Sequence, residues 1–264
     1  MCRALQLVQQ EERERVLAFR YRADSAASLV GRLLLRAFAV QALGAENSQL
    51  QFQRTDKGKP FVVGGCGDWD YNVSHAGDWV VLAADIRGRC GVDTMRLTDS
   101  RVDRLDHFFR LMQRQFTATE FSAIRGTEED GKAAQLSRFF RNWSLKESYV
   151  KATGSGITVD LQSLNFLVAG TVEAGRVESG TRLELAGQPA DWRFEESLLD
   201  EDHIVSVAVE GISTETEIFT VLNIQQILSL FQLKTEQNPD SSLLRKLDPA
   251  DFLLFTSLEH PKPW

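Results

Sequence analysis

The segment RFFRNWSLKESYVKATGSG, residues 138–156, decides the fold around it, because its pattern predicts one long helix. Gly154 is the expected end of this helix, since glycine commonly follows a helix C-terminus. Apolar residues recur at helical spacing, at Leu136, Phe139, Phe140, Trp143 and Val150. Glu147 falls four residues after Trp143, and Lys151 falls one turn later, so both charges share the apolar face. A carboxylate and an ammonium on that face need a partner that the helix itself does not supply.

The composition is that of an ordinary globular protein. The chain has 264 residues, of which 43% are hydrophobic and 25% are charged. This length supports a sizeable core, arranged as one large domain or as two lobes. The formal charge of −7 and the pI of about 5.3 argue against general binding of nucleic acid or anionic membranes, but they leave room for a local basic pocket.

The N-terminus and the cysteines favour the cytosol. Residues 1–20 alternate charged and apolar side chains and lack the continuous apolar stretch of a signal peptide. No other run approaches the length of a membrane span. The cysteines Cys2, Cys66 and Cys90 lack the spacing of a metal site, which predicts thiols in a reducing compartment.

Strands and helices are expected along most of the chain. The first clear helix is predicted from Ser25, as its N-cap, to Gly44. A charged helical region follows at 101–120, a polar loop at 125–133 and an apolar patch at 218–233, before a polar, loosely attached C-terminal tail. Strands are expected at 50–54, 69–75, 79–85, 90–95, 164–168, 181–187, 191–197 and 203–211.

Two segments of the chain resemble each other. In residues 74–88 and in residues 198–212, a turn with an aspartate precedes a strand of small and apolar residues. Two unrelated hairpins would also produce this likeness. A true repeat predicts an α+β protein of two similar lobes with a ligand cleft between them. The corresponding domains are residues 1–97, residues 98–212 and a C-terminal extension, residues 213–264.

Two acidic residues stand in unusual places. Asp93 lies in the expected strand 90–95, where aspartate is depleted, so it either caps the strand end or acts as a ligand. Glu147 either forms a buried ion pair with a nearby arginine or lysine, for which Arg138 and Arg141 are available, or also acts as a ligand. One carboxylate from a strand and one from a helix suit Mg²⁺, which completes its shell with water and substrate phosphate oxygens.

Basic residues that could hold such a phosphate occur in the first part of the chain. Each alone is more often a solvated surface charge or a structural histidine, so the prediction depends on their combination. Glycine in the turn 54–60 allows close approach of the backbone. The candidates are Arg32 and Arg36 on the first helix, Arg54, Lys57 and Lys59 around Gly58, and Ser74 with His75 at a strand-to-turn transition.

These motifs together resemble the phosphopantetheinyl transferases. GVDTM (residues 91–95) matches the G-[IV]-D strand of that family, and NWSLKESYVKATGSGI (142–157) matches its W-[SCTA]-x-K-E-[SA]-x-x-K helix. FTATEFSAI (116–124) fills the intermediate F-[ST]-x-x-E position with Glu120. The segments GRLLLR (31–36), RTDKGKP (54–60) and NVSHAGDW (72–79) look most like the large two-lobed animal members. The resemblance covers roughly residues 1 to 210.

The resemblance implies a pseudo-dimer of two α+β lobes with the active site in the cleft between them. It implies that Mg²⁺ and coenzyme A bind there, and that 4′-phosphopantetheine passes to a serine of an apo acyl carrier protein, with release of adenosine 3′,5′-bisphosphate. Carrier domains of the fatty acid synthase type and the aminoadipate-semialdehyde dehydrogenase type would connect the enzyme to fatty acid biosynthesis and lysine metabolism. A cytosolic monomer that binds neither nucleic acid nor membrane is expected.

The resemblance also implies roles for individual residues. Asp93 and Glu147 would bind the metal. Glu147 would be the base, directly or through a metal-bound water, and Lys151 would stabilise or protonate the leaving bisphosphate. The expected contacts of coenzyme A are Arg32, Arg54, Thr55, Asp56, Lys57, Gly58, Lys59, Asn72, Val73, Ser74, His75, Asp93, Glu147, Ser148, Tyr149, Val150 and Lys151.

The sequence departs from the family pattern at two positions. Bacterial relatives often carry a third acid where this chain has Met95, so another group must complete the metal shell. Animal relatives often carry glutamine where this chain has Ala76. Two alternatives therefore stay open, a coenzyme A-binding regulatory protein without transfer activity and a Mg²⁺-dependent phosphohydrolase with water as acceptor.

Overall fold

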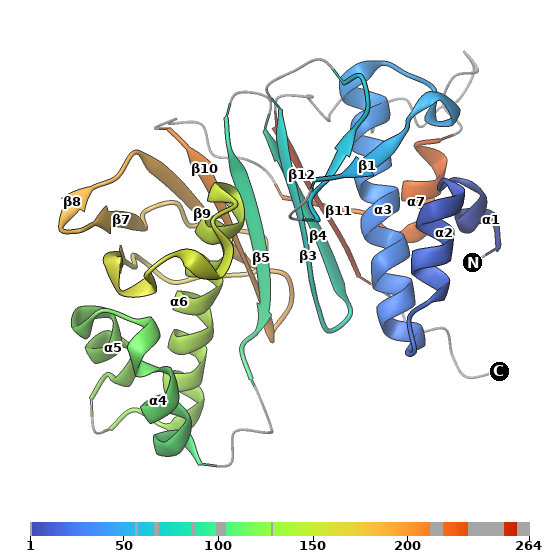
Figure 1. Ribbon diagram of the computed structural model, residues 1–264. Coiled ribbons are helices and arrows are strands. Elements are labelled where there is room, and N and C mark those ends of the chain that lie inside the picture. Colours follow the sequence, from blue (N-terminus) through green and yellow to red (C-terminus); the bar gives the residue numbers. More distant parts are fainter. Residues whose placement is uncertain are drawn as a thin grey trace. The chain divides into compact units, whose positions relative to one another are not determined.

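In the computed structural model, the chain forms two units, each with a long helix packed on a sheet (Figure 1). The first unit comprises Met1–Arg87 together with Thr220–Trp264, and the second comprises Gly88–Phe219. The structure describes residues 2–55, 58–65, 69–85, 88–98, 104–127, 129–211, 219–231 and 251–257.

The first unit contains a four-stranded sheet in the order β11-β12-β4-β3 and a separate β1-β2 hairpin. All strand pairs are antiparallel except β11-β12. Its helices are α1 (Cys2–Gln6), α2 (Gln10–Leu17), α3 (Arg22–Leu43), the short 3₁₀ helix η1 (Asn47–Gln49) and α7 (Ile224–Ser229). Its strands are β1 (Phe52–Arg54), β2 (Pro60–Val62), β3 (Asp70–Ala76), β4 (Trp79–Asp85), β11 (Thr220–Val221) and β12 (Asp251–Ser257).

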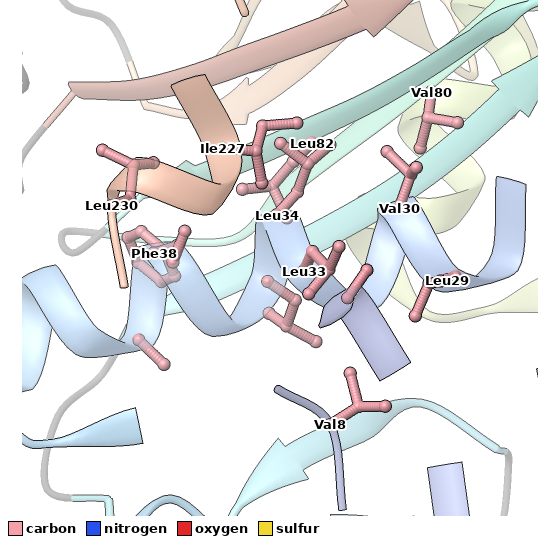
Figure 2. Close-up of a cluster of buried hydrophobic side chains, with 14 of the residues drawn as sticks. Val8, Leu29, Val30, Leu33, Leu34, Phe38, Val80, Leu82, Ile227 and Leu230 are labelled. Atoms are coloured by element: carbon pink, nitrogen blue, oxygen red, sulfur yellow. The ribbon is translucent and has the colours of Figure 1, made fainter. Parts of the chain in front are cut away.

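Helix α3 is the centre of the first unit. Figure 2 shows its buried side chains meeting residues of β4 and α7, including Leu34, Phe38, Leu82 and Ile227. By length and composition α3 would also be long enough to cross a membrane, but 61% of its most apolar stretch is buried, as in a core helix. Of the described helices it alone passes that test.

The start of α3 differs from the expectation. Tyr21 is the N-cap, and Ser25 lies inside the first turn, where its hydroxyl donates to the Val16 carbonyl at 2.9 Å. The side chain of Ser25 therefore joins α3 to α2 instead of capping the helix. The predicted end is confirmed, because Gly44 adopts the left-handed conformation with φ of 60°.

The second unit holds two three-stranded antiparallel sheets, in the orders β5-β10-β9 and β6-β7-β8. Its helical elements are α4 (Leu105–Met112), η2 (Gln113–Gln115), α5 (Ala118–Arg125), α6 (Lys132–Thr153), η3 (Gly156–Thr158) and η4 (Leu161–Ser163). Its strands are β5 (Cys90–Arg96), β6 (Leu164–Leu167), β7 (Arg182–Leu185), β8 (Gln188–Pro189), β9 (Trp192–Leu198) and β10 (His203–Glu210).

The helical region expected at 101–120 is interrupted. The structure describes α4 and η2 and then a break at Thr117, whose hydroxyl accepts from the Glu120 backbone N–H at 3.1 Å. The Glu120 carboxylate in turn accepts from the Thr117 N–H at 2.8 Å, so the pair forms a capping box that starts α5. Residues 101–103 lie outside the described part of the chain.

Helix α6 packs directly against strand β5, and a glycine makes this possible. A Cβ atom at Gly91 would lie 2.1 Å from the Ser148 carbonyl oxygen and 2.4 Å from the Ala152 nitrogen. Real Cβ atoms essentially never come so close to backbone atoms. The backbones of helix and strand therefore touch at this point, two residues before Asp93.

The buried face of α6 is not quite the face that the apolar pattern indicated. Leu145, Tyr149 and Ala152 enter the core with β6, β7 and β9, whereas Trp143 and Val150 are only partly buried. Glu147 and Lys151 accordingly lie at a half-buried margin of the helix. The charged side chain that does enter the core is Lys146, whose pKa is lowered by burial against the opposing effect of Glu120.

The structure divides the chain differently from the expected domains 1–97, 98–212 and 213–264. Residues 88–97 belong to the second unit, because β5 pairs with β10 and packs under α6. The C-terminal extension is not a detached tail where it is described. Leu222, Ile227 and Leu230 are buried in the first unit, and β12 pairs with β4. Residues 232–250 and 258–264 lie outside the described part.

Both segments of the suspected repeat are hairpins. Residues 74–88 include the turn between β3 and β4, and residues 198–212 include the turn between β9 and β10. Each unit also has a 22-residue helix that ends at a left-handed glycine, Gly44 or Gly154. The mixed α+β class is thus confirmed, whereas a pseudo-dimer with a cleft between lobes stays a prediction.

We predict that Gly91→Ala destabilises the protein, because the added methyl group forces α6 away from β5. Overpacking of this kind typically costs about 1–3 kcal/mol, measurable by denaturant unfolding. Gly88→Ala is the matched control, since its Cβ would find its nearest neighbour at an ordinary 3.6 Å. Equal stability of the two variants would contradict the proposed contact.

Candidate active site

Asp93 lies in the interior of β5, opposite Ser206 of β10, and the strand continues to Arg96. The alternative that Asp93 caps the strand end is therefore wrong. Its carboxylate is nearly buried, and its Oδ1 accepts a hydrogen bond from Lys151 Nζ at 2.6 Å. The Ser144 hydroxyl of α6 donates to the Asp93 carbonyl at 3.3 Å, which adds a second tie between strand and helix.

Glu147 and Lys151 approach Asp93 from α6. Burial raises the pKa of Glu147, the negative charge of Asp93 raises it further, and Lys151 partly opposes both effects. The arginines that were alternative partners for Glu147 are engaged elsewhere. Arg138 pairs with Asp130 at 3.2 Å, and Arg141 pairs with Glu196 at 2.7 Å. Neither Arg138 nor Arg141 is therefore the ion-pair partner of Glu147.

This arrangement fits a small divalent cation. The negative charge of Asp93 raises the pKa of Glu147, so the two carboxylates repel one another, and hard oxygen ligands of this kind are what Mg²⁺ prefers. In the part of the chain that the structure describes, no cluster of three or more acidic, histidine or cysteine side chains is formed. Met95 packs beside the α4–α6 core, so protein carboxylates would supply two ligands, and water and substrate the rest.

The neighbouring residues of α6 do not all face this site. Ser148 is fully buried, and its hydroxyl donates to the Leu145 carbonyl at 2.8 Å. Tyr149 packs edge-on against Trp192, with 4.9 Å between the ring centres. Val150 contacts the same core. The side chains of Ser148 and Tyr149 are thus part of the core, and the contacts of coenzyme A with residues 148–150 stay a prediction.

The predicted basic turn lies in the first unit between β1 and β2. Arg54 donates to the Gly58 carbonyl, and the Thr55 hydroxyl accepts from the Lys59 N–H at 3.2 Å. Lys59 also forms an ion pair with Asp70, and Gly58 has a φ of 83°, which favours glycine. Of its described basic residues, Arg54 is exposed and Lys59 is half-buried. Asp56 and Lys57, also expected to contact coenzyme A, lie outside the described residues.

The two arginines of α3 differ in role. Arg36 is buried and bonds Glu12 at 2.7 Å and Asn47 at 3.0 Å, so it holds the N-terminal segment. Arg32 lies 3.8 Å from Glu12, and its buried Nε makes no hydrogen bond. Burial lowers the pKa of Arg32, and the positive charge of Arg54 contributes to that shift. The structure therefore places Arg32 within the electrostatic influence of Arg54.

The segment 72–75 is inside strand β3, not at its end. Ser74 pairs with Val81 and His75 pairs with Val80 across the ladder with β4. Ser74 is buried, His75 is exposed, and Asn72 and Val73 are half-buried. The strand ends at Ala76, two residues after Ser74, and β3 stands last in the described sheet.

Sequence reasoning missed two features of the site. Gly91 was noted only as part of a motif, although its missing side chain lets α6 reach β5. Lys146 and Glu120 were likewise noted only as motif positions, although they form a buried ion pair at 2.9 Å beside Glu147. The position of Gly91, Glu120 and Lys146 within the family motifs is the sequence feature that could have indicated both.

Comparison with known families covers both units. The family described as "4'-phosphopantetheinyl transferase, N-terminal" matches residues 1–87, and the "4'-phosphopantetheinyl transferase superfamily" matches residues 89–208. The change between the two matches coincides with the boundary between the structural units.

Individual relatives agree with the family matches. The L-aminoadipate-semialdehyde dehydrogenase-phosphopantetheinyl transferase of Xenopus laevis is 35% identical over 249 residues, which covers 88% of this chain and 82% of the relative. A phosphopantetheinyl transferase of Thraustochytrium is 41% identical over 77% of this chain and 70% of the relative. The 4'-phosphopantetheinyl transferase of Bacillus subtilis is 29% identical over 62% of this chain and 67% of the relative. The chain therefore belongs to the 4′-phosphopantetheinyl transferase superfamily and resembles its animal L-aminoadipate-semialdehyde dehydrogenase-phosphopantetheinyl transferases.

Proposed function

We propose that the protein transfers 4′-phosphopantetheine from coenzyme A to a serine of an apo acyl carrier protein, in a reaction that needs Mg²⁺. Family membership supports phosphopantetheinyl transfer, and the names of the animal relatives point to carrier domains of the aminoadipate-semialdehyde dehydrogenase type. The observation that carries the proposal is the convergence of Asp93, Glu147 and Lys151 on one margin of the second unit.

The proposed reaction is a displacement at phosphorus. The serine oxygen bonds to the phosphorus that carries pantetheine, and the bond from that phosphorus to the bridging oxygen breaks. The electron pair leaves with adenosine 3′,5′-bisphosphate, and the serine proton passes to a base. Because little covalent work is left to the protein, positioning and electrostatics dominate such a transfer.

We assign the base to Glu147. Because a cation bound by Glu147 would lower the basicity of its carboxylate, Glu147 would accept the proton directly or through a metal-bound water. Lys151 is assigned to the leaving bisphosphate, whose charge it would stabilise. When bound by Asp93 and Glu147, Mg²⁺ would neutralise the pyrophosphate.

In the first unit, we propose that Arg32 and Arg54 contact the phosphates of coenzyme A. The buried Nε of Arg32 makes no hydrogen bond, and an anion would satisfy it, while the positive charge of Arg54 acts on the same region. Lys59 and His75 are further candidates, because both are at least partly exposed.

The first test concerns the two carboxylates. We predict that Asp93→Asn and Glu147→Gln each lower the rate of transfer by about 10²-fold or more, the order expected when one preorganised electrostatic group is lost. The rate is measured from the intact mass of an apo carrier protein incubated with coenzyme A and Mg²⁺. Asp130→Asn is the control, because Asp130 pairs with Arg138 instead.

The outcomes of that assay also separate the alternatives. A phosphohydrolase would consume coenzyme A without changing the mass of the carrier, and a regulatory protein would bind coenzyme A without consuming it. Normal transfer by either carboxylate variant would remove Asp93 or Glu147 from the proposed site.

The second test concerns Lys151. We predict that Lys151→Met lowers kcat by about 10²-fold with little change in the KM for coenzyme A, because leaving-group charge develops only in the transition state. Mg²⁺ affinity should be retained or increased, since the ammonium no longer competes for Asp93. Steady-state kinetics with a Mg²⁺ titration measures both. Lys132→Met, at the start of the same helix, is the control. Weaker Mg²⁺ affinity in Lys151→Met would show that Lys151 supports the metal ligands instead.

The third test compares the two arginines of α3. Loss of one charge-assisted contact typically costs about 1.5–3 kcal/mol, so Arg32→Met should raise the KM for coenzyme A by about 10- to 100-fold. Arg36→Met should instead lower the melting temperature, because it leaves Glu12 without its buried partner. A melting temperature that falls equally in both variants, with KM unchanged, would mean that Arg32 is structural.

A further inference from the structure

Lys146 makes a dense set of contacts on the side of α6 away from the solvent. Its Nζ lies 2.9 Å from Glu120 Oε2 and donates to the carbonyls of Leu161 and Leu164 at 2.8 and 2.6 Å. The rings of Phe116 and Phe166 lie 5.4 and 5.8 Å from the same ammonium. Only 1% of the Lys146 side chain and none of the Glu120 side chain is exposed, so solvent does not weaken the pair.

Glu120 connects this ammonium to two further elements. Its Oε2 accepts from the Thr117 N–H at the start of α5, and its Oε1 accepts from the Phe166 N–H of β6 at 2.9 Å. The Thr117 hydroxyl also contacts Asn165 Oδ1 of β6 at 2.7 Å. The pair therefore joins α5, η4 and β6 to one point of α6.

Lys146 directly precedes Glu147 in α6. Successive residues of a helix project about 100° apart, so Lys146 and Glu147 point in different directions. Holding Lys146 in place thus fixes the rotation of α6 about its axis, while contact with Gly91 fixes its distance from β5. A small rotation of α6 would carry Glu147 and Lys151 away from Asp93 without separating helix and sheet.

We propose that Glu120 and Lys146 are positioning residues for phosphopantetheinyl transfer, which hold α6 in the rotation that turns Glu147 and Lys151 toward Asp93. This inference rests on the proposed function, which it deepens. Neither residue touches substrate. A buried ion pair contributes little net stability compared with apolar residues of similar volume, so a role in specifying geometry accounts for its presence better than stability does.

The test uses a neutral replacement of the pair. Lys146→Met alone leaves the Glu120 carboxylate buried without its cation and is expected to lower the melting temperature strongly. The double variant Glu120→Gln/Lys146→Met removes both charges and keeps an amide oxygen for the Phe166 N–H. It should recover most of the lost melting temperature. Its kcat should nevertheless stay at least tenfold below wild type, with the KM for coenzyme A nearly unchanged.

A measurement without turnover accompanies the kinetics. Mn²⁺, a spectroscopic probe for the Mg²⁺ site, is titrated into each protein and followed by electron paramagnetic resonance, with no carrier protein present. The double variant should bind Mn²⁺ about tenfold more weakly than wild type, because Glu147 no longer faces Asp93. If wild type binds Mn²⁺ but transfers no phosphopantetheine, the proposed function fails while the positioning role is still tested.

The matched control is Arg141→Met/Glu196→Gln, which neutralises another buried pair between α6 and the same unit. Arg141 lies six residues before Glu147, and its partner Glu196 is on β9. This variant should keep the Mn²⁺ affinity of wild type. Three results would overturn the positioning role. The Glu120/Lys146 variant could keep the kcat and Mn²⁺ affinity of wild type, or both double variants could lose kcat and Mn²⁺ affinity equally. Wild type could also fail to bind Mn²⁺.

Discussion

The candidate site depends on the contact between the backbones of α6 and β5 at Gly91. Any side chain at this position would meet the Ser148 carbonyl and the Ala152 nitrogen, so only glycine lets the helix lie against the strand. The consequence reaches two residues along the strand, where Asp93 meets Lys151 at 2.6 Å. A strand carboxylate and a helix carboxylate become neighbours because the elements that carry them touch.

The described residues include buried charges of two kinds. Arg36 with Glu12, Arg141 with Glu196, and Lys146 with Glu120 are enclosed pairs whose hydrogen bonds join separate elements. The group around Asp93 differs, because Glu147 and Lys151 remain partly exposed and two carboxylates face one ammonium. The excess negative charge there is what a divalent cation would neutralise, which distinguishes this group from the structural pairs.

The sequence predicted the features that depend on local pattern. The presence of α6, its end at Gly154 and the strand around Asp93 follow from periodicity and glycine placement. Features that depend on distant partners were missed. The hydroxyl of Ser25 bonds Val16 instead of capping α3. Lys146 is the buried charge of α6, because its partner Glu120 comes from another helix. Strand β12, near the C-terminus, pairs with β4 of the first unit. Hydrophobic periodicity carries no information about such contacts.

The most direct measurement is the anomalous diffraction of Mn²⁺ in crystals of the protein with coenzyme A. If Asp93 and Glu147 form the cation site, the anomalous peak will lie between their carboxylates, and Lys151 will have left Asp93 for the phosphates. A structure in which Lys151 still bonds Asp93 and the Mn²⁺ peak lies elsewhere, or is absent, would contradict this account of the site.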